Sequence, residues 1–217
     1  MEVGIRNDIH TYSGGLGVLA GDVIRSSADL SVPMVAVTLV SRKGYLKQKL
    51  NGSGEQSELP DDWDPTQVTE LASKTIEIKI ENRPVTVQAW IYEHKSALGS
   101  TVPILFLDTD VEGNSPEDRR ITDSLYGGDE TNRLKQEIVL GIGGTRMLDA
   151  LGFTISKYHM NEGHSALLTL ELLRNHEYNV EDVRNHCIST THTPVEAGFD
   201  KFPYPLVQRV LGHEIPS

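Results

Sequence analysis

The sequence has a single cysteine, few aromatic residues and no excess of positive charge. One cysteine, Cys187, excludes a disulfide within the chain and is expected to be a small core residue. The sequence has 31 acidic and 20 basic residues, which gives a formal net charge of −11. Nonspecific binding to nucleic acid is therefore not expected, although a local basic pocket for one phosphate remains compatible with this balance.

Long hydrophobic runs are also missing. No run approaches the roughly 18 apolar residues that a membrane span requires, and Met1 to Asp8 carries charges instead of a signal-peptide core. We therefore expect a soluble, cytoplasmic protein with no membrane partner. Its 217 residues suffice for one large domain or two small ones.

The first part of the sequence predicts a helix, a buried strand and a β-hairpin. The glycine-rich segment 12–17 leads into apolar residues at helical spacing, which predicts a helix that ends before Pro33. The continuous apolar run 34–40 predicts a strand buried on both faces. Alternating runs at 75–80 and 85–92 predict the hairpin.

The second part predicts alternating strands and helices. A long helix is expected over 129–150, where Gly141, Gly143 and Gly144 indicate close backbone packing or a break. Further strands are expected at 103–108, 155–160 and 187–191, further helices at 165–174 and 179–185, and a loop at 46–65. This alternation favours an open, mostly parallel α/β sheet.

Two segments stand out as candidate binding sites. Gly14, Gly15 and Leu16 form a glycine turn at a helix start, which is either an anion site or a plain tight turn. The segment Asn161-Glu162-Gly163-His164 follows a predicted strand, where ligands bind in open α/β sheets, but Asn161 could equally cap a helix.

Two further candidates leave the same choice open. His192 follows another predicted strand and is either a hydrogen-bonded structural histidine or a site residue. Asp129 comes after two glycines and either starts a helix or belongs to a site. No metal site is expected, because His159 and His164 lack the i, i+4 spacing of a zinc helix and no third ligand is evident.

Six segments, in the same order, resemble the α-glucan phosphorylase family and in particular its shorter bacterial and archaeal branch. They are 12–22, 44–45 with 61–63, 125–129, 133–137, 159–165, and 191–195 with 197–198. The resemblance implies a GT-B glycosyltransferase with two Rossmann-like domains facing a deep cleft. It also implies transfer of glucosyl units from α-1,4-glucan to phosphate, which gives glucose 1-phosphate.

By this resemblance, residues 1–217 are one Rossmann-like N-terminal domain with a β-hairpin excursion, the catalytic half of the enzyme. Its first strand is largely missing. Pyridoxal phosphate is the family's cofactor, and its lysine lies in a C-terminal domain that this chain lacks. A C-terminal phosphorylase domain or a second polypeptide is therefore an expected partner. The chain alone is expected to be inactive, and a homo-oligomer is compatible with its open cleft face.

The resemblance also implies roles for particular residues. Gly14, Gly15 and Leu16 belong to the loop whose amides face the phosphate and glucosyl groups. His164 resembles the histidine that binds the glucosyl unit, and Asp129 matches a position in the loop that gates the site. Asn161, Glu162 and His192 are grouped with the substrate-binding residues without a firmer role.

Two other functions remain open. A glycogen or starch synthase has a similar glycine turn, but lysine precedes it there and Ser13 stands here. A chain of this kind could also be a carbohydrate-binding or regulatory remnant without catalytic activity.

Overall fold

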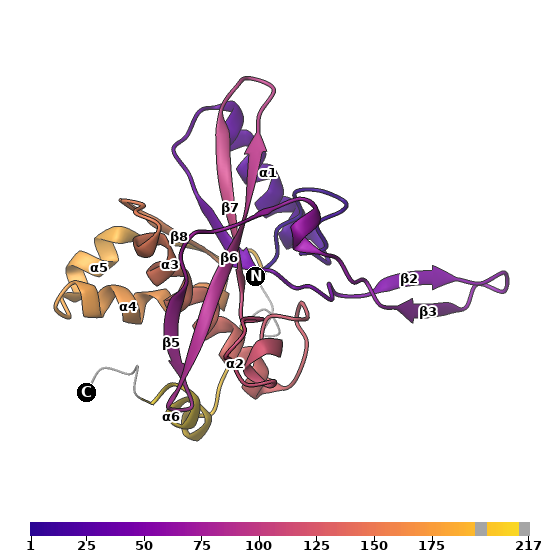
Figure 1. Ribbon diagram of the computed structural model, residues 1–217. Helices are drawn as coiled ribbons and strands as arrows, with labels where there is room; N and C mark the ends of the chain where they lie inside the picture. Colours follow the sequence, from indigo (N-terminus) through magenta and orange to yellow (C-terminus); the bar gives the residue numbers. More distant parts are fainter. Residues whose placement is uncertain (194–198, 213–217) are drawn as a thin grey trace.

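The computed structural model describes residues 1–193 and 199–212 and shows an α/β fold around a five-stranded mixed sheet (Figure 1). The strand order is β1-β7-β6-β4, and β5 also pairs with β6. These strands are β1 (Ala36–Leu39), β4 (Glu70–Leu71), β5 (Ile76–Ile80), β6 (Arg83–Lys95) and β7 (Thr101–Asp108). The α/β class expected from the sequence is confirmed.

The main sheet is mixed and not mostly parallel, which corrects the expectation. Only the β1–β7 pairing of this sheet is parallel within the described residues, while β4, β5 and β7 all pair with β6 in antiparallel fashion. The reason is local. Glu81 and Asn82, with φ of 50° and 65°, join β5 to β6 in a two-residue turn with positive φ at both positions, which is the geometry of a tight hairpin. The predicted hairpin is thereby confirmed.

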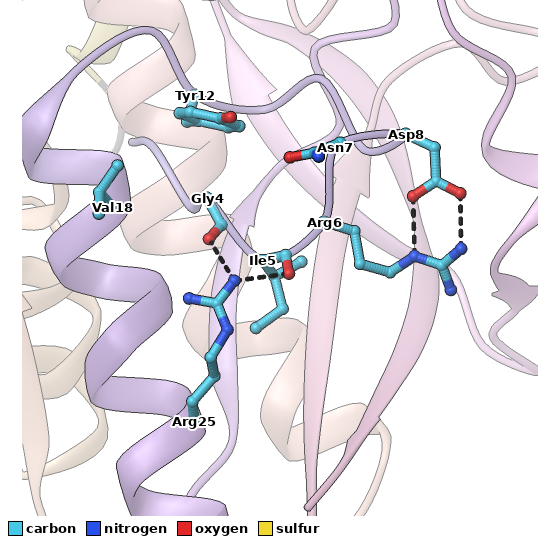
Figure 2. A pocket seen from close by; sticks show the side chains of 8 residues that line it. All are labelled: Gly4, Ile5, Arg6, Asn7, Asp8, Tyr12, Val18 and Arg25. Carbon is cyan, nitrogen blue, oxygen red and sulfur yellow. Dashed lines mark hydrogen bonds and ion pairs between the residues drawn. The ribbon is translucent and has the colours of Figure 1, made fainter.

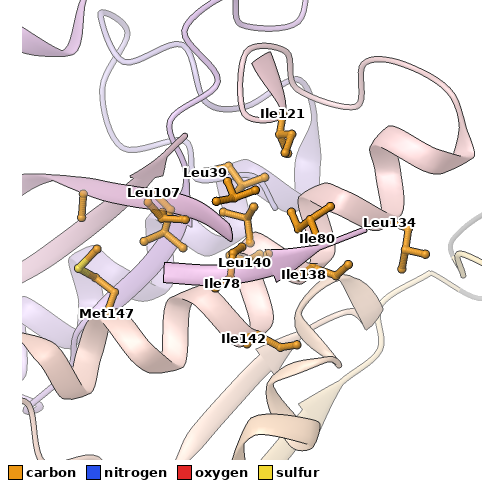
Figure 3. Packing of buried hydrophobic residues seen from close by; sticks show 14 of the residues in the cluster. Leu39, Ile78, Ile80, Leu107, Ile121, Leu134, Ile138, Leu140, Ile142 and Met147 are labelled. Atoms are coloured by element: carbon orange, nitrogen blue, oxygen red, sulfur yellow. The ribbon is translucent and has the colours of Figure 1, made fainter. Parts of the chain in front are cut away.

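Helices cover both faces of the main sheet. The helix α1 (Gly15–Asp29) packs with the N-terminal segment on one face. A continuous helical segment packs on the other: α2 (Glu130–Ile138), the π-helical η3 (Val139–Gly143) and α3 (Gly144–Ala150). Figure 3 shows Leu134, Ile138 and Ile142 from this segment near Ile78 and Ile80 of β5. Both predicted helices are therefore present.

The glycines of the long helix explain its central irregularity. A Cβ added to Gly141 would lie 2.6 Å from the backbone nitrogen of Leu168, so this glycine permits close approach of a second backbone. The hydroxyl of Thr145 donates to the Gly141 carbonyl at 3.0 Å. Of the two outcomes expected from the sequence, close packing is confirmed. The helix does not break at these glycines but changes to π-helical geometry over Val139–Gly143.

A second, smaller unit follows the long helix. Its parallel strands are β8 (Tyr158–Asn161) and β9 (Cys187–Thr190), connected through the short η4 (Gly163–Ser165), α4 (Leu168–Asn175) and α5 (Val180–His186). It has its own core, formed by Met160, Leu168, Leu172 and Val183. Strand–helix alternation gives a parallel pairing here, as expected, because helices separate the two strands in the chain.

Some elements were not expected from the sequence. The segment predicted as a loop contains an antiparallel hairpin, β2 (Lys47–Leu50) and β3 (Gln56–Leu59), whose eight residues are all exposed. Figure 1 shows this hairpin extending away from the body. Two short 3-10 turns and a further helix complete the described chain: η1 (Pro65–Gln67), η2 (Asp118–Arg120) and α6 (Tyr204–Leu211). No helix in the described part is long and apolar enough to cross a membrane.

Candidate functional site

A small cavity lies where the start of α1 meets the end of β8. It has a volume of about 10 Å³, which is room for roughly one water molecule. Its lining residues are Met1, Glu2, Leu16, Tyr126, Asn161, Glu162 and His164. The structure thus brings together four residues singled out in the sequence, Leu16, Asn161, Glu162 and His164, from two segments far apart in the chain.

The amides of the glycine turn already bind a carboxylate. Glu2 Oε2 accepts hydrogen bonds from the backbone nitrogens of Ser13 at 2.7 Å and Gly14 at 3.0 Å, and the hydroxyl of Tyr126 donates to Glu2 Oε1 at 2.6 Å. Burial raises the pKa of Glu2, but these hydrogen bonds outweigh it and hold the pKa below its ordinary value. The turn therefore binds an anion, and that anion is the carboxylate of Glu2 from the same chain.

The glycines of this turn fall into two groups. A Cβ on Gly17 would lie 2.5 Å from Tyr12 Cβ, and one on Gly21 would lie 2.1 Å from the Gly4 carbonyl oxygen, so packing requires both glycines. Gly14 and Gly15 are exposed, and nothing lies within 4 Å of a Cβ added there. Internal packing therefore does not explain the glycines at positions 14 and 15, which leave the backbone open to an external group.

His164 is buried against acidic groups. Its Nδ1 lies 3.2 Å from Asp200 Oδ2 and 3.7 Å from Glu137 Oε1, and its ring packs edge-on against Tyr126. Burial lowers the pKa of His164 to about 4, helped by the nearby charge of Arg133 and opposed by Asp200. The imidazole is therefore neutral near pH 7 and acts as a hydrogen-bonding group and not as a cation.

Glu137 and Asp200 are a coupled pair of carboxyl groups. Burial, together with the neighbouring Asp200, raises the pKa of Glu137 to about 9. Asp200 Oδ2 accepts two hydrogen bonds of 3.1 Å from Arg133. Glu137 is therefore protonated near pH 7, and the neighbouring Asp200 is ionised. Although Glu137, His164 and Asp200 are close enough to share a metal ion, the Arg133 guanidinium on Asp200 disfavours a second cation there.

Glu162 organises the segment that carries His192. Its backbone has φ of 63°, and its Oε1 accepts hydrogen bonds from the backbone nitrogens of His192 at 2.6 Å and Thr193 at 3.0 Å. Its Oε2 is buried and has no hydrogen-bond partner among the described residues. The exposed ring of His192 places Nε2 3.0 Å from Asn161 Oδ1. The matching segment at 194–198 lies outside the described residues.

Asp129 is not part of this cavity. It is exposed, and its side chain accepts a hydrogen bond from the backbone nitrogen of Asn132 as the N-cap of α2. Sequence reasoning assigned no role to Glu2, Tyr126, Glu137 or Asp200. Tyr126 and Glu137 stand within segments that resemble the family, and that was the available signal. Asp200 gave none, because its contacts with Arg133 and His164 are tertiary.

A larger depression lies on the other side of the N-terminal segment. Its volume is about 400 Å³, and Figure 2 shows Tyr12, Arg25, Arg6 and Asp8 among the residues that line it. Both of its arginines are engaged: Arg6 pairs with Asp8, and Arg25 donates to the carbonyl oxygens of Gly4 and Ile5. None of the site residues expected from the sequence lines this depression.

Comparison with known proteins identifies the family. No protein-family model matches the chain. The chain is 40% identical to the maltodextrin phosphorylase of Thermococcus litoralis over 97% of its own length, and 36% identical to the glycogen phosphorylase of Mycobacterium tuberculosis over 99%. The chain belongs to the α-glucan phosphorylase family. It spans about a quarter of the length of these relatives, 26% and 27%.

The buried lysine among the described residues does not fit the covalent site of pyridoxal phosphate. That cofactor requires a lysine whose amine loses its proton to form a Schiff base. The lysine that is buried in the described part, Lys135, lies 3.1 Å from Glu81 and 3.0 Å from Glu117. Burial lowers the pKa of Lys135, but these two carboxylates outweigh it and raise the pKa above its ordinary value, which keeps the amine charged.

Proposed function

We propose that this phosphorylase chain supplies the glycine-turn side of an active-site cleft in which a glucosyl unit passes from α-1,4-glucan to phosphate and gives glucose 1-phosphate. The observation that carries the proposal is the meeting of the glycine turn with Asn161, Glu162 and His164 at one small cavity. The named relatives, a maltodextrin phosphorylase and glycogen phosphorylases, support it. We further propose that this chain folds as a Rossmann-like domain of a GT-B enzyme and that the enzyme acts in the cytoplasm.

The site has two layers with different roles. We call Glu2, Tyr126, Glu137 and His164 the floor, because they are at least partly buried and contact one another. We call Gly14, Gly15 and His192 the rim, because they are exposed. The cavity is too small for a whole sugar ring, so we assign most of the substrate contacts to the rim. The open amides at the start of α1 suit a phosphate or a sugar hydroxyl, and the His192 imidazole suits a sugar hydroxyl.

Two glutamates position the rim: Glu2, which belongs to the floor, and Glu162, which lines the cavity. Glu2 holds the glycine turn by accepting hydrogen bonds from two of its backbone amides. Glu162 holds the backbone at His192 and Thr193 in the same way. His164, which the resemblance associates with glucosyl binding, is 8% exposed and engaged with Asp200. We therefore propose that neutral His164 binds the glucosyl unit only by presenting its remaining ring nitrogen at the cavity, while His192 makes the outer contact. Asp129 keeps its proposed place in a gating loop outside the cavity.

We propose that the remaining chemistry comes from residues outside the 217 of this sequence. A C-terminal phosphorylase domain or a second polypeptide would hold pyridoxal phosphate, which would supply a phosphate group near the substrate phosphate. Basic groups from that partner would neutralise the phosphate dianion. The chain alone should bind maltodextrin weakly and release no glucose 1-phosphate.

A complementation assay tests the proposal. The chain is incubated with maltodextrin, phosphate and pyridoxal phosphate, with and without the separately produced remainder of the Thermococcus litoralis enzyme. We expect glucose 1-phosphate only when both parts are present. His192→Ala should then lower turnover by about 100-fold, the usual cost of one polar contact to the transition state. His94→Ala is the control. The charges of Arg25 and Asp29 influence the pKa of His94, so its side chain lies near the later turns of α1 and away from Gly15.

Two results would favour the other functions. A mixed complex that binds maltodextrin but never turns it over indicates a carbohydrate-binding or regulatory role. Transfer from a nucleotide sugar without phosphorolysis indicates a synthase. Phosphorolysis by the chain alone would show that the whole active site lies within its 217 residues and would refute the divided cleft.

A further inference from the structure

Three potential metal ligands meet at the corner between α4 and α5, in the second unit and apart from the candidate site. They are His176, Asp182 and His186, all partly buried. Each offers one ligand atom, and these atoms lie within 4.8 Å of one another. His176 Nδ1 is 2.5 Å from Asp182 Oδ2, and His186 Nδ1 is 3.6 Å from Asp182 Oδ1. The two imidazole rings have their centroids 5.0 Å apart.

Local structure explains why the three side chains meet. Asp182 and His186 are separated by four residues on α5, so they share one face of the helix. His176 follows the end of α4, and Glu177 and Tyr178, with φ of 50° and 62°, turn the chain back toward α5. The Asn179 side chain caps α5 by accepting a hydrogen bond from the backbone nitrogen of Asp182. Backbone geometry therefore fixes the position of all three residues.

The distances and ligand types match a late first-row metal ion. Zinc bonds to imidazole and carboxylate are about 2.0–2.2 Å long, which puts neighbouring ligand atoms of a tetrahedral site about 3.3–3.6 Å apart. The separations of 2.5 and 3.6 Å therefore require only small side-chain adjustments. In the metal-free chain the backbone carbonyl of Asp182 lies 2.8 Å from His186 Nδ1, and a metal ion bound at Nδ1 replaces this hydrogen bond, because a ligating nitrogen must be deprotonated.

We propose that His176, Asp182 and His186 form a binding site for one divalent metal ion of the zinc class, with a fourth position for water. Two neutral imidazoles and one carboxylate leave a net charge of about +1 with Zn²⁺, and the chain as a whole carries −11, so the ion is not repelled. The ion clamps the end of α4 to the end of α5, directly before β9 begins at Cys187. The site is structural, because it joins two helices outside the candidate active site.

Calorimetric titration of the metal-free chain with Zn²⁺ tests this proposal. We expect one ion per chain with a Kd in the micromolar range or tighter, and a rise in Tm with added Zn²⁺. His176→Gln and His186→Gln should each weaken binding at least tenfold. His159→Gln is the matched control, because that histidine is exposed and bonded to Thr190 on the other edge of the unit. Asp200→Asn controls for the acidic cluster around His164.

A second measurement needs no substitution. Co²⁺ bound to the unmodified chain should give the visible absorption of a tetrahedral site, and imidazole nitrogen resonances of two histidines should shift on Zn²⁺ addition. Zinc binding that the His176 and His186 variants retain in full, or the absence of binding by the folded chain, would overturn the proposal. In that case the three side chains form only a hydrogen-bonded link between the helices.

Discussion

The floor and the rim of the candidate site lie side by side but satisfy their polar groups in different ways. On the floor, Glu2 accepts four hydrogen bonds from the protein itself, and Glu137 keeps its proton beside Asp200. On the rim, Gly14 and Gly15 have open space in front of the backbone. The floor residues contribute to the stability of this chain, whereas the proposed role of the rim residues is to contact a ligand.

This comparison predicts which measurement responds to each substitution. Changes on the floor, or in the packing beneath it, should alter the free energy of unfolding. Changes on the rim should alter ligand binding and turnover and leave unfolding nearly unchanged.

The largest effect should come from the packing beneath the floor. In Gly21→Ala the new Cβ would lie 2.1 Å from the carbonyl oxygen of Gly4, and backbone must move to relieve this contact. We expect a loss of about 3 kcal/mol or more in the free energy of unfolding, measured by urea denaturation. Gly14→Ala is the matched control. Equal stability of the two variants would mean that the N-terminal segment does not pack on α1 as described.

Glu137→Gln should stabilise the protein at alkaline pH. The folded pKa of about 9 lies above the ordinary value of 4.5, so between these values the unfolded state releases a proton that the folded state keeps. The contribution of Glu137 to stability is complete below pH 4.5 and is lost as pH rises toward 9, by at most about 1.4 kcal/mol per pH unit.

The measurement is the difference in unfolding free energy between Glu137→Gln and the unsubstituted chain at pH 6, 7 and 8. We expect the variant's advantage to grow with pH and to reach about 3 kcal/mol at pH 8. His164 has the opposite dependence, because its pKa falls to about 4, but its contribution is common to both proteins. A difference that does not change with pH would contradict a neutral Glu137.

Tyr126→Phe should have a smaller effect. It removes the donor to Glu2 Oε1 and leaves a buried carboxylate oxygen without that partner, at a cost of about 2 kcal/mol. The same variant should raise the pKa of Glu2, because the tyrosine hydrogen bond is one of the interactions that lower it. Thermal unfolding at pH 7 and pH 4 measures both effects. Tyr45→Phe, on an exposed tyrosine, should change neither quantity.

The smallest effect on stability should come from the rim. Gly15→Ala places a methyl group in open space at the first residue of α1, so the free energy of unfolding should change by less than about 1 kcal/mol. Turnover of the complemented enzyme should nevertheless fall, because the methyl group obstructs approach to the amides. Unchanged kinetics of the Gly15→Ala enzyme would mean that the glycine turn does not bind substrate and is a plain tight turn.

Sequence patterns predicted the elements whose signal is local. The apolar stripe from Leu16 predicted α1, and two alternating runs predicted the β5–β6 hairpin. The β2–β3 hairpin was missed because all eight of its residues are exposed and carry no alternation. The helix α6 was not predicted, although Leu206, Val207, Val210 and Leu211 have helical spacing and Pro205 stands in its first turn, where proline is favoured.

The candidate site divides in the same way. The turn at Gly14 and the segment at His164 are visible as glycine and strand-end patterns. The contact between Tyr126 and Glu2 joins residues 124 positions apart, and no periodicity encodes it. The antiparallel pairing of β6 with β7 was likewise hidden, because the apolar pattern of a strand does not determine which strand pairs with its second edge.

The π-helical turn at Val139–Gly143 has a consequence for motion. Because the backbone of Gly141 lies against that of Leu168, the second unit is joined to the long helix at a point with no side chain between them. Hydrogen exchange of the Leu168 amide and of the amides of Val139–Gly143 should therefore proceed through one common opening, with one free energy. The β8–β9 unit and the main sheet would then respond to heat or denaturant as a single cooperative body, which keeps His164 in register with the glycine turn until global unfolding.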